Sequence, residues 1–196
     1  AEAARDLLND REPTQRDKIV SVLPYLFPLL DSLQFGRFLI ADNQDNPFVV
    51  ALALLYAMYR AVPFSGFISF LALNVLSSNP RINRLVRFNM QQAIFIDIAL
   101  FFPGLIAAAY TLVASGAGLQ MPAGLTELGS DVIFGGLLLT IAYTGTSSLL
   151  GLTPNKIPLI SQAVEDRMPT VDMFDESGQF VSRRSKEKKD DDRDNQ

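Results

Sequence analysis

Long apolar stretches alternate with short polar segments along the chain, and charged residues collect at its two ends. Four apolar stretches stand out, over residues 19–40, 48–76, 88–113 and 132–152. A helix needs about 20 apolar residues to cross the roughly 30 Å hydrocarbon core of a bilayer. The pattern therefore predicts an all-α polytopic membrane protein, a bundle of four transmembrane helices with polar termini.

The polar segments divide the chain into three parts. Residues 1–18 form a polar N-terminal segment, residues 19–153 the four-helix transmembrane domain, and residues 154–196 a polar C-terminal tail. The tail has mixed charges and few apolar residues, so we expect it to be largely disordered. The chain begins at Ala1 rather than at a methionine, which fits the removal of a targeting segment.

The first apolar stretch is the least regular of the four. It contains Pro24, Pro28, Asp31, Gly36 and Arg37, which lipid disfavours unless neighbouring helices cover them. If neighbouring helices of a bundle cover these residues, the stretch crosses the bilayer as the first span. The alternative is an interfacial or re-entrant segment that does not cross the bilayer.

The distribution of basic residues supports the count of four. Lys and Arg collect on the side of a membrane from which segments are not translocated. Four spans place 15 of the 17 basic residues on one side, with Arg37 on the other and Arg60 inside a span. Arg81, Arg84 and Arg87, in the loop before the third span, are interpreted as topology anchors on the side of both termini.

Composition narrows the chemistry. The chain has no cysteine and no histidine, which removes thiol catalysis and the commonest general base and metal ligand. The basic residues are scattered among acidic ones, so no nucleic-acid signature appears. We therefore expect no cofactor, no metal and no enzymatic activity.

Three charged residues lie within the predicted spans, where charge is costly. Asp31, Arg60 and Asp97 each lie about 15–18 Å from the end of their span, at about 1.5 Å per helical residue. They therefore share the middle of the bilayer, and we interpret them as a group in which Arg60 pairs with Asp97, Asp31 or both. The alternative is that Arg60 extends towards the membrane surface and Asp31 lies at an interface.

The second and fourth spans carry further polar features. Pro63 removes a backbone hydrogen bond and predicts a kink in the second span. On the fourth span, five hydroxyl groups recur at helical spacing and share one face: Thr140, Tyr143, Thr144, Ser147 and Ser148. This face can line a polar path, or it can pack against a neighbouring helix, as small polar residues often do in membranes.

Two segments of the chain resemble the Tic-twenty family, the small four-span subunit of the protein translocon at the inner envelope membrane of chloroplasts. The first runs from Leu23 to Arg37, and the second from Asn79 through Gln92 to Ile98. The residues that carry the resemblance are Pro24, Tyr25, Pro28, Asp31, Gly36, Arg37, Asn79, Pro80, Arg81, Phe88, Asn89 and Gln92. It extends over roughly residues 17–160.

The resemblance implies a multi-pass protein of the chloroplast inner envelope membrane with both termini in the stroma. It implies a core translocon subunit that takes part in the import of precursor proteins. The implied partners are other Tic membrane subunits, the Toc complex of the outer envelope, precursor proteins in transit, and lipids. Two alternatives stay open. One is a small-solute or ion transporter or channel of the envelope, suggested by Pro63, Arg60 and the hydroxyl groups of the fourth span, and the other is a purely structural assembly subunit.

Overall fold

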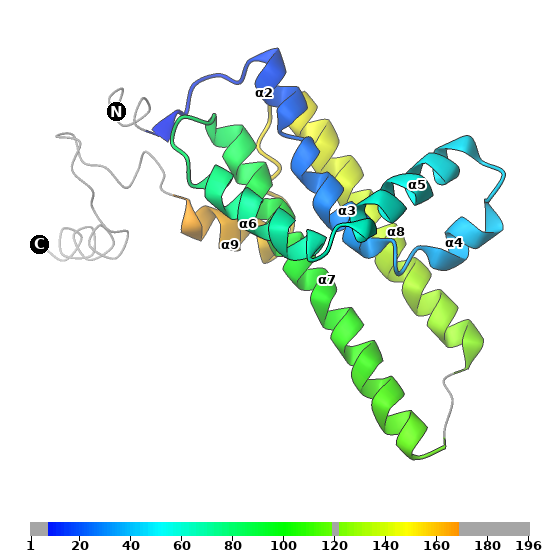
Figure 1. The fold of residues 1–196 in the computed structure, drawn as a ribbon. Coiled ribbons are helices and arrows are strands. Elements are labelled where there is room, and N and C mark those ends of the chain that lie inside the picture. Colours follow the sequence, from blue (N-terminus) through cyan, green and yellow to red (C-terminus); the bar gives the residue numbers. More distant parts are fainter. Residues whose placement is uncertain (1–7, 119–121, 169–196) are drawn as a thin grey trace, which may run out of the picture.

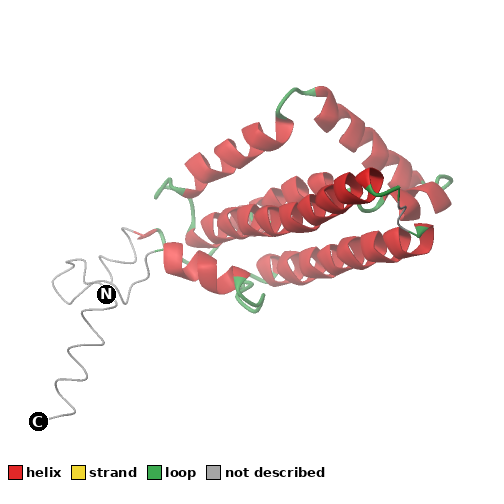
Figure 2. Ribbon diagram, turned by 90° about the horizontal axis from the view of Figure 1, so that it is seen from below, coloured by secondary structure: helices red, strands yellow, loops and turns green. Residues whose placement is uncertain are grey.

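The computed structural model describes residues 8–118 and 122–168. These residues form helices joined by short loops, without a strand among them, so the all-helical prediction is confirmed (Figures 1 and 2). The elements are α2 (Gln15–Val20), η1 (Leu23–Tyr25), α3 (Leu26–Ser32), α4 (Arg37–Asp42), α5 (Pro47–Ala61), α6 (Ser65–Ser77), α7 (Arg84–Gly116), α8 (Ala123–Leu149) and α9 (Ile160–Arg167).

Two helices of the described chain, α7 and α8, are each long and apolar enough to cross a membrane. Helix α7 begins where the Asn83 side chain accepts a hydrogen bond from the Leu85 backbone N–H at 2.9 Å. Helix α8 begins at Ala123, well before the predicted start at residue 132. The reason is that Pro122 occupies its N-cap, and the residues that follow contain no further proline before the apolar stretch.

Helices α5 and α6 together cover the second apolar stretch, but they meet at an angle of 89°. Val62 is extended, with φ −82° and ψ 118°, because a residue that precedes proline is excluded from the helical region. Phe64 then adopts a left-handed conformation, with φ 58°, before α6 starts. The pair is a third candidate span only if the two helices are counted as one.

The first apolar stretch is not a continuous helix, so the predicted span at residues 19–40 is not among the helices long enough to cross a membrane. It is divided among α2, η1, α3 and α4. Pro24 and Pro28 each lie in the first turn of a short helix, where a missing N–H costs little. Gly36 is the N-cap of α4, and the turn before it separates α4 from α3. By length and composition, the described residues therefore contain two spanning helices, or three with the bent pair.

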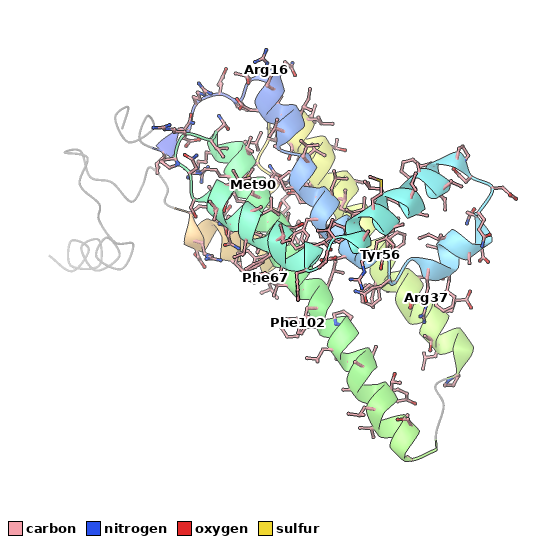
Figure 3. All side chains as sticks on the ribbon, viewed as in Figure 1. Arg16, Arg37, Tyr56, Phe67, Met90 and Phe102 are labelled. Carbon is pink, nitrogen blue, oxygen red and sulfur yellow. The ribbon has the colours of Figure 1, made fainter. Side chains whose placement is uncertain are left out.

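The core lies where η1, α3, α6 and α9 pack against α7, with α8 alongside α3 (Figure 1). Tyr25, Ala93, Ile96 and Leu137 form its centre, each 5% exposed or less. Helices α4 and α5 form an extension beside this core, and Arg37 marks its start (Figure 3). Partly buried side chains of both helices pack against the buried residues Leu30, Leu33, Phe35 and Phe134: Ile40, Leu52, Tyr56 and Tyr59. Helix α5 has no buried residue at all.

Candidate functional site

Buried polar side chains from distant parts of the chain meet within the core. The Tyr25 hydroxyl lies 2.5 Å from Asn89 Oδ1 and 2.6 Å from Gln92 Oε1, and it donates its single proton between these two acceptors. Gln92 Nε2 donates to the Pro154 carbonyl at 2.9 Å and to Ser161 Oγ at 3.0 Å. These contacts join η1, α7, α9 and the segment before α9.

The same network reaches the fourth predicted span. Ser148 Oγ donates to Asn89 Oδ1 at 3.0 Å, and Asn89 Nδ2 donates to the Leu85 carbonyl of its own helix at 2.8 Å. Tyr25, Asn89, Gln92, Ser148 and Ser161 are each 1% exposed or less. Since a buried polar group without a partner costs about 1–3 kcal/mol, a network this well paired fixes the relative position of its helices. We call these five side chains the Tyr25 network.

The end of α8 brings the Pro154 carbonyl into this network. Gly151 is left-handed, with φ 80°, and its N–H bonds to the Ser148 carbonyl at 2.9 Å, while the Leu152 N–H bonds to the Ser147 carbonyl at 2.9 Å. These two backbone hydrogen bonds together form a Schellman motif, which ends a helix and reverses the direction of the chain. The reversed chain then passes Gln92 at Pro154.

Helix α9 was not expected from the sequence. Val164 is fully buried and Met168 is 4% exposed, and both pack against Phe88 of α7. The expected polar tail at residues 154–196 therefore starts with an ordered helix, and its residues 169–196 lie outside the described part. The apolar positions Ile160, Val164 and Met168 recur every four residues, and this spacing is the signal that could have predicted the helix.

The three charged residues that the sequence placed within spans line one cavity. Its volume is about 260 Å³, and the residues around it include Asp31, Gln34, Arg60, Gly66 and Asp97. The carboxylate of Asp31 interacts with the Asp97 carboxyl group and with the positive charge of Arg60. We call this the Asp31–Asp97 cavity.

The bend between α5 and α6 positions the walls of this cavity. A Cβ atom on Gly66 would lie 3.4 Å from Asp31 Oδ2 and 3.5 Å from the Tyr59 hydroxyl, so the start of α6 runs close beside α3. The Tyr59 hydroxyl is buried, interacts with Asp31 and lacks a hydrogen bond of ordinary geometry. Because Pro63 lies between Tyr59 and Gly66, straightening the bend would move Arg60 away from the carboxylates.

Arg60 is expected to couple to the carboxylates of Asp31 and Asp97, because the three side chains line one cavity. In a double-mutant cycle of Arg60→Leu with Asp31→Leu, we expect a coupling of about 1 kcal/mol, within the range for neighbouring residues. A second cycle, of Arg60→Leu with Asp97→Leu, measures the coupling to the other carboxylate. The measurement is unfolding of the purified protein in detergent; zero coupling in both cycles would leave Arg60 as a residue that extends to the membrane surface.

The hydroxyl face of α8 divides between the core and its surface. Thr144 and Ser148 are fully buried, and Thr144 donates to the Ile141 carbonyl at 3.1 Å. Thr140 donates to the Gly136 carbonyl at 2.9 Å, and the Tyr143 hydroxyl accepts from the Lys156 N–H at 3.2 Å. Ser147 is half-buried. The contacts of the buried members are those of a packing face.

The predicted topology anchors have different surroundings. Arg81 is exposed, and its N–H bonds to Asn79 Oδ1 at 3.0 Å in the turn that contains Pro80. Arg84 is half-buried, and Arg87 is only 5% exposed. The remaining motif residues are structural in their contacts: Pro28 and Phe88 are almost fully buried, and Arg37 lies over the Phe38 ring at 4.8 Å. Within residues 8–118 and 122–168, no group of three or more acidic side chains is placed to hold a metal ion.

Comparison with known proteins agrees with the resemblance. The family model described as chloroplast import apparatus Tic20-like matches residues 6–164. Protein TIC 20-v, chloroplastic, of Arabidopsis thaliana is 35% identical over 153 residues, which cover 76% of this chain and 69% of that protein. Protein TIC 20-II, chloroplastic, of the same plant is 32% identical over 155 residues, covering 75% and 70%. A Tic20 family protein of Synechocystis sp. is 35% identical over 153 residues, covering 76% and 90%.

No solved structure matches the chain. The family match nevertheless spans both the Tyr25 network and the Asp31–Asp97 cavity, from before α2 to the buried face of α9. With relatives above 30% identity over most of its length, this chain belongs to the Tic20 family of the chloroplast import apparatus.

Proposed function

We propose that this chain is a core membrane subunit of the chloroplast inner-envelope translocon and takes part in the import of precursor proteins into the stroma. It would act with other Tic membrane subunits, with the Toc complex of the outer envelope, and with precursors in transit. Membership in an import-apparatus family, which is a family of translocon components rather than of enzymes, supports the proposal.

The observation that carries this proposal is the apolar extension formed by α4 and α5. Helix α5 has no buried residue, and Phe48, Leu54 and Met58 along it are 73%, 63% and 62% exposed. Phe64, at the bend, is 82% exposed. A helix this poorly covered by its own chain offers its surface to lipid or to neighbouring helices. This arrangement suits a subunit of a larger membrane assembly.

The proposed topology has four crossings and both termini in the stroma. The short helices between residues 19 and 40 would make the first crossing, covered by α7 and α8, and the bent α5–α6 pair the second. In this arrangement the N-terminal segment, the loop with Arg81 and the segment after α8 share one side. The charge distribution supports this arrangement through the excess of basic residues on that side.

Site-specific photocrosslinking during arrested import of a precursor tests the function. Probes replace Arg60 and Asp97 at the cavity and Thr144 and Ser147 on α8, with a probe at Leu139, which is 74% exposed, as the surface control. We expect crosslinks to the precursor or to other Tic subunits that depend on the arrested precursor. If every probe crosslinks only to lipid, with and without precursor, the proposed role in import is wrong.

The second candidate function is a small-solute or ion transporter, and the Asp31–Asp97 cavity favours it. A transporter should hold its buried charges around one site within a single chain, and Asp31, Arg60 and Asp97 do line one cavity. Flux assays on the purified chain in vesicles distinguish the two functions. Flux that Asp97→Leu abolishes would support the transporter, whereas the translocon proposal expects no such flux from the isolated chain.

A further inference from the structure

A second polar cavity lies at the end of the bundle, between the end of α6, the first turns of α7 and the end of α9. Its volume is about 320 Å³, and it is lined by Ser77, Ser78, Pro80, Arg87, Gln91 and Arg167, among others. It is separate from the Asp31–Asp97 cavity, with which it shares no lining residue. We call it the Arg87 cavity.

Two buried side chains in this cavity have unused hydrogen-bonding groups. Arg87 is 5% exposed, and its Nε–H has no hydrogen-bond partner among the residues that the structure describes. Gln91 is 8% exposed; its Nε2 donates to Ser77 Oγ at 2.7 Å, but its Oε1 accepts nothing. Both atoms are covered in the structure. Because burying such groups without partners is costly, a ligand that supplies an acceptor for Arg87 and a donor for Gln91 favours a rotation of these side chains towards the cavity.

The charge around the cavity specifies the sign of that ligand. Arg84 repels the Arg87 charge, and Asp10 offsets it in part. Arg167 adds a further guanidinium, which also lies 5.7 Å from the Phe95 ring. Arg87 and Arg167 line the cavity, and no acidic residue is among the described residues that line it. Guanidinium groups bind phosphate oxygens in pairs, which makes a phosphate the fitting anion.

The surroundings specify that the phosphate belongs to a lipid. The cavity lies at the end of α7, a helix that is long and apolar enough to span a membrane. Immediately before Ser77, helix α6 exposes Leu71, Val75 and Leu76, at 45%, 71% and 43%. These side chains provide an apolar surface for acyl chains that continue from a headgroup in the cavity.

We propose that the Arg87 cavity binds the headgroup of an anionic phospholipid with a free hydroxyl, such as phosphatidylglycerol. Phosphate oxygens would accept from Arg87 and Arg167, and a glycerol hydroxyl would donate to Gln91 Oε1. The acyl chains would lie along the exposed face of α6. This binding requires only that the chain resides in a membrane, so it does not depend on the proposed role in import.

Lipid binding to the purified full chain in detergent tests the proposal. Phosphatidylglycerol, phosphatidylcholine and inorganic phosphate are titrated separately, with bound lipid counted by native mass spectrometry and stability followed by the melting temperature. We expect phosphatidylglycerol to bind at least about tenfold more tightly than phosphatidylcholine, because phosphatidylcholine has the same phosphate but places a choline cation beside the arginines and has no hydroxyl for Gln91. Equal binding of the two lipids would overturn the proposal. Stabilisation by inorganic phosphate at the same concentration as the lipid would overturn the lipid assignment.

Variants connect the binding to this cavity. Arg87→Gln changes a buried residue that folding can require, so Arg167→Gln, at an exposed position, carries the test. We expect Arg167→Gln to weaken phosphatidylglycerol binding about tenfold. Arg81→Gln is the matched control, because it removes the same charge from an exposed residue at the same end of the bundle that does not line the cavity. An equal loss in both variants would reduce the effect to general surface charge and contradict the proposal.

Discussion

Replacing Gln92 by leucine should lower the free energy of unfolding by about 2–4 kcal/mol, since it removes three hydrogen bonds from the centre of the core. Leucine has a similar size, so the loss would come from the polar groups that remain. The Tyr25 hydroxyl would lose one of its two acceptors and keep Asn89, and the Pro154 carbonyl would keep only a longer bond from Ser161, at 3.3 Å. Thermal and SDS-induced unfolding in detergent, followed by circular dichroism, measures the change.

The control for this prediction is Gln162→Leu on α9. Gln162 is exposed, so the same substitution there should change stability by less than about 0.5 kcal/mol. A second comparison combines Gln92→Leu with Tyr25→Phe. Because both changes remove the same hydrogen bond, the double variant should lose less stability than the two single losses added together. Equal effects of Gln92→Leu and Gln162→Leu would mean that the Tyr25 network does not stabilise the fold.

The second large effect is expected at Gly36, where the turn between α3 and α4 approaches α8. A Cβ atom at Gly36 would lie 2.9 Å from the ring of Phe134, which is buried at 5% exposure. Gly36→Ala should therefore destabilise the protein by about 1–3 kcal/mol through overpacking. The same unfolding measurement applies.

Gly136→Ala on α8 gives the opposite expectation. A Cβ atom there has nothing within 4 Å, and glycine inside a helix is less stable than alanine by about 0.5–1 kcal/mol. Gly136→Ala should therefore leave stability unchanged or raise it. Combining Gly36→Ala with Phe134→Leu should recover part of the loss, because the smaller side chain makes room. If Gly36→Ala is as stable as Gly136→Ala, the turn does not pack against α8 as described.

The sequence predicts the long helices well and the short ones poorly. An apolar stretch as long as 88–113 has few structures available to it in lipid, and α7 contains it. Pro63 excludes the helical region for the residue before it, which is a local effect and can be read from two residues. The division of residues 19–40 into short helices depends instead on contacts with α7 and α8, which no local pattern contains.

The two sites differ in the same way. Counting residues predicts a similar depth for Asp31, Arg60 and Asp97, but their meeting in one cavity depends on the 89° bend. Tyr25, Asn89 and Gln92 were singled out by the family resemblance. The spacing of hydrophobic residues alone would not have predicted that their side chains form one hydrogen-bond network. Ser161 escaped prediction because the charged residues after Pro154 masked the short apolar repeat of α9.

The Tyr25 network also constrains the order in which the protein can be assembled. Its hydrogen bonds join residues that are 59 to 69 positions apart in the chain. Loops of this length close late, because their entropy is lost before the contact rewards it. Gln92 cannot complete its bonds until Pro154 and Ser161 have arrived, and those residues follow the last long helix. We therefore expect the docking of α9, which completes the network, to be a late step of folding that follows the placement of α8.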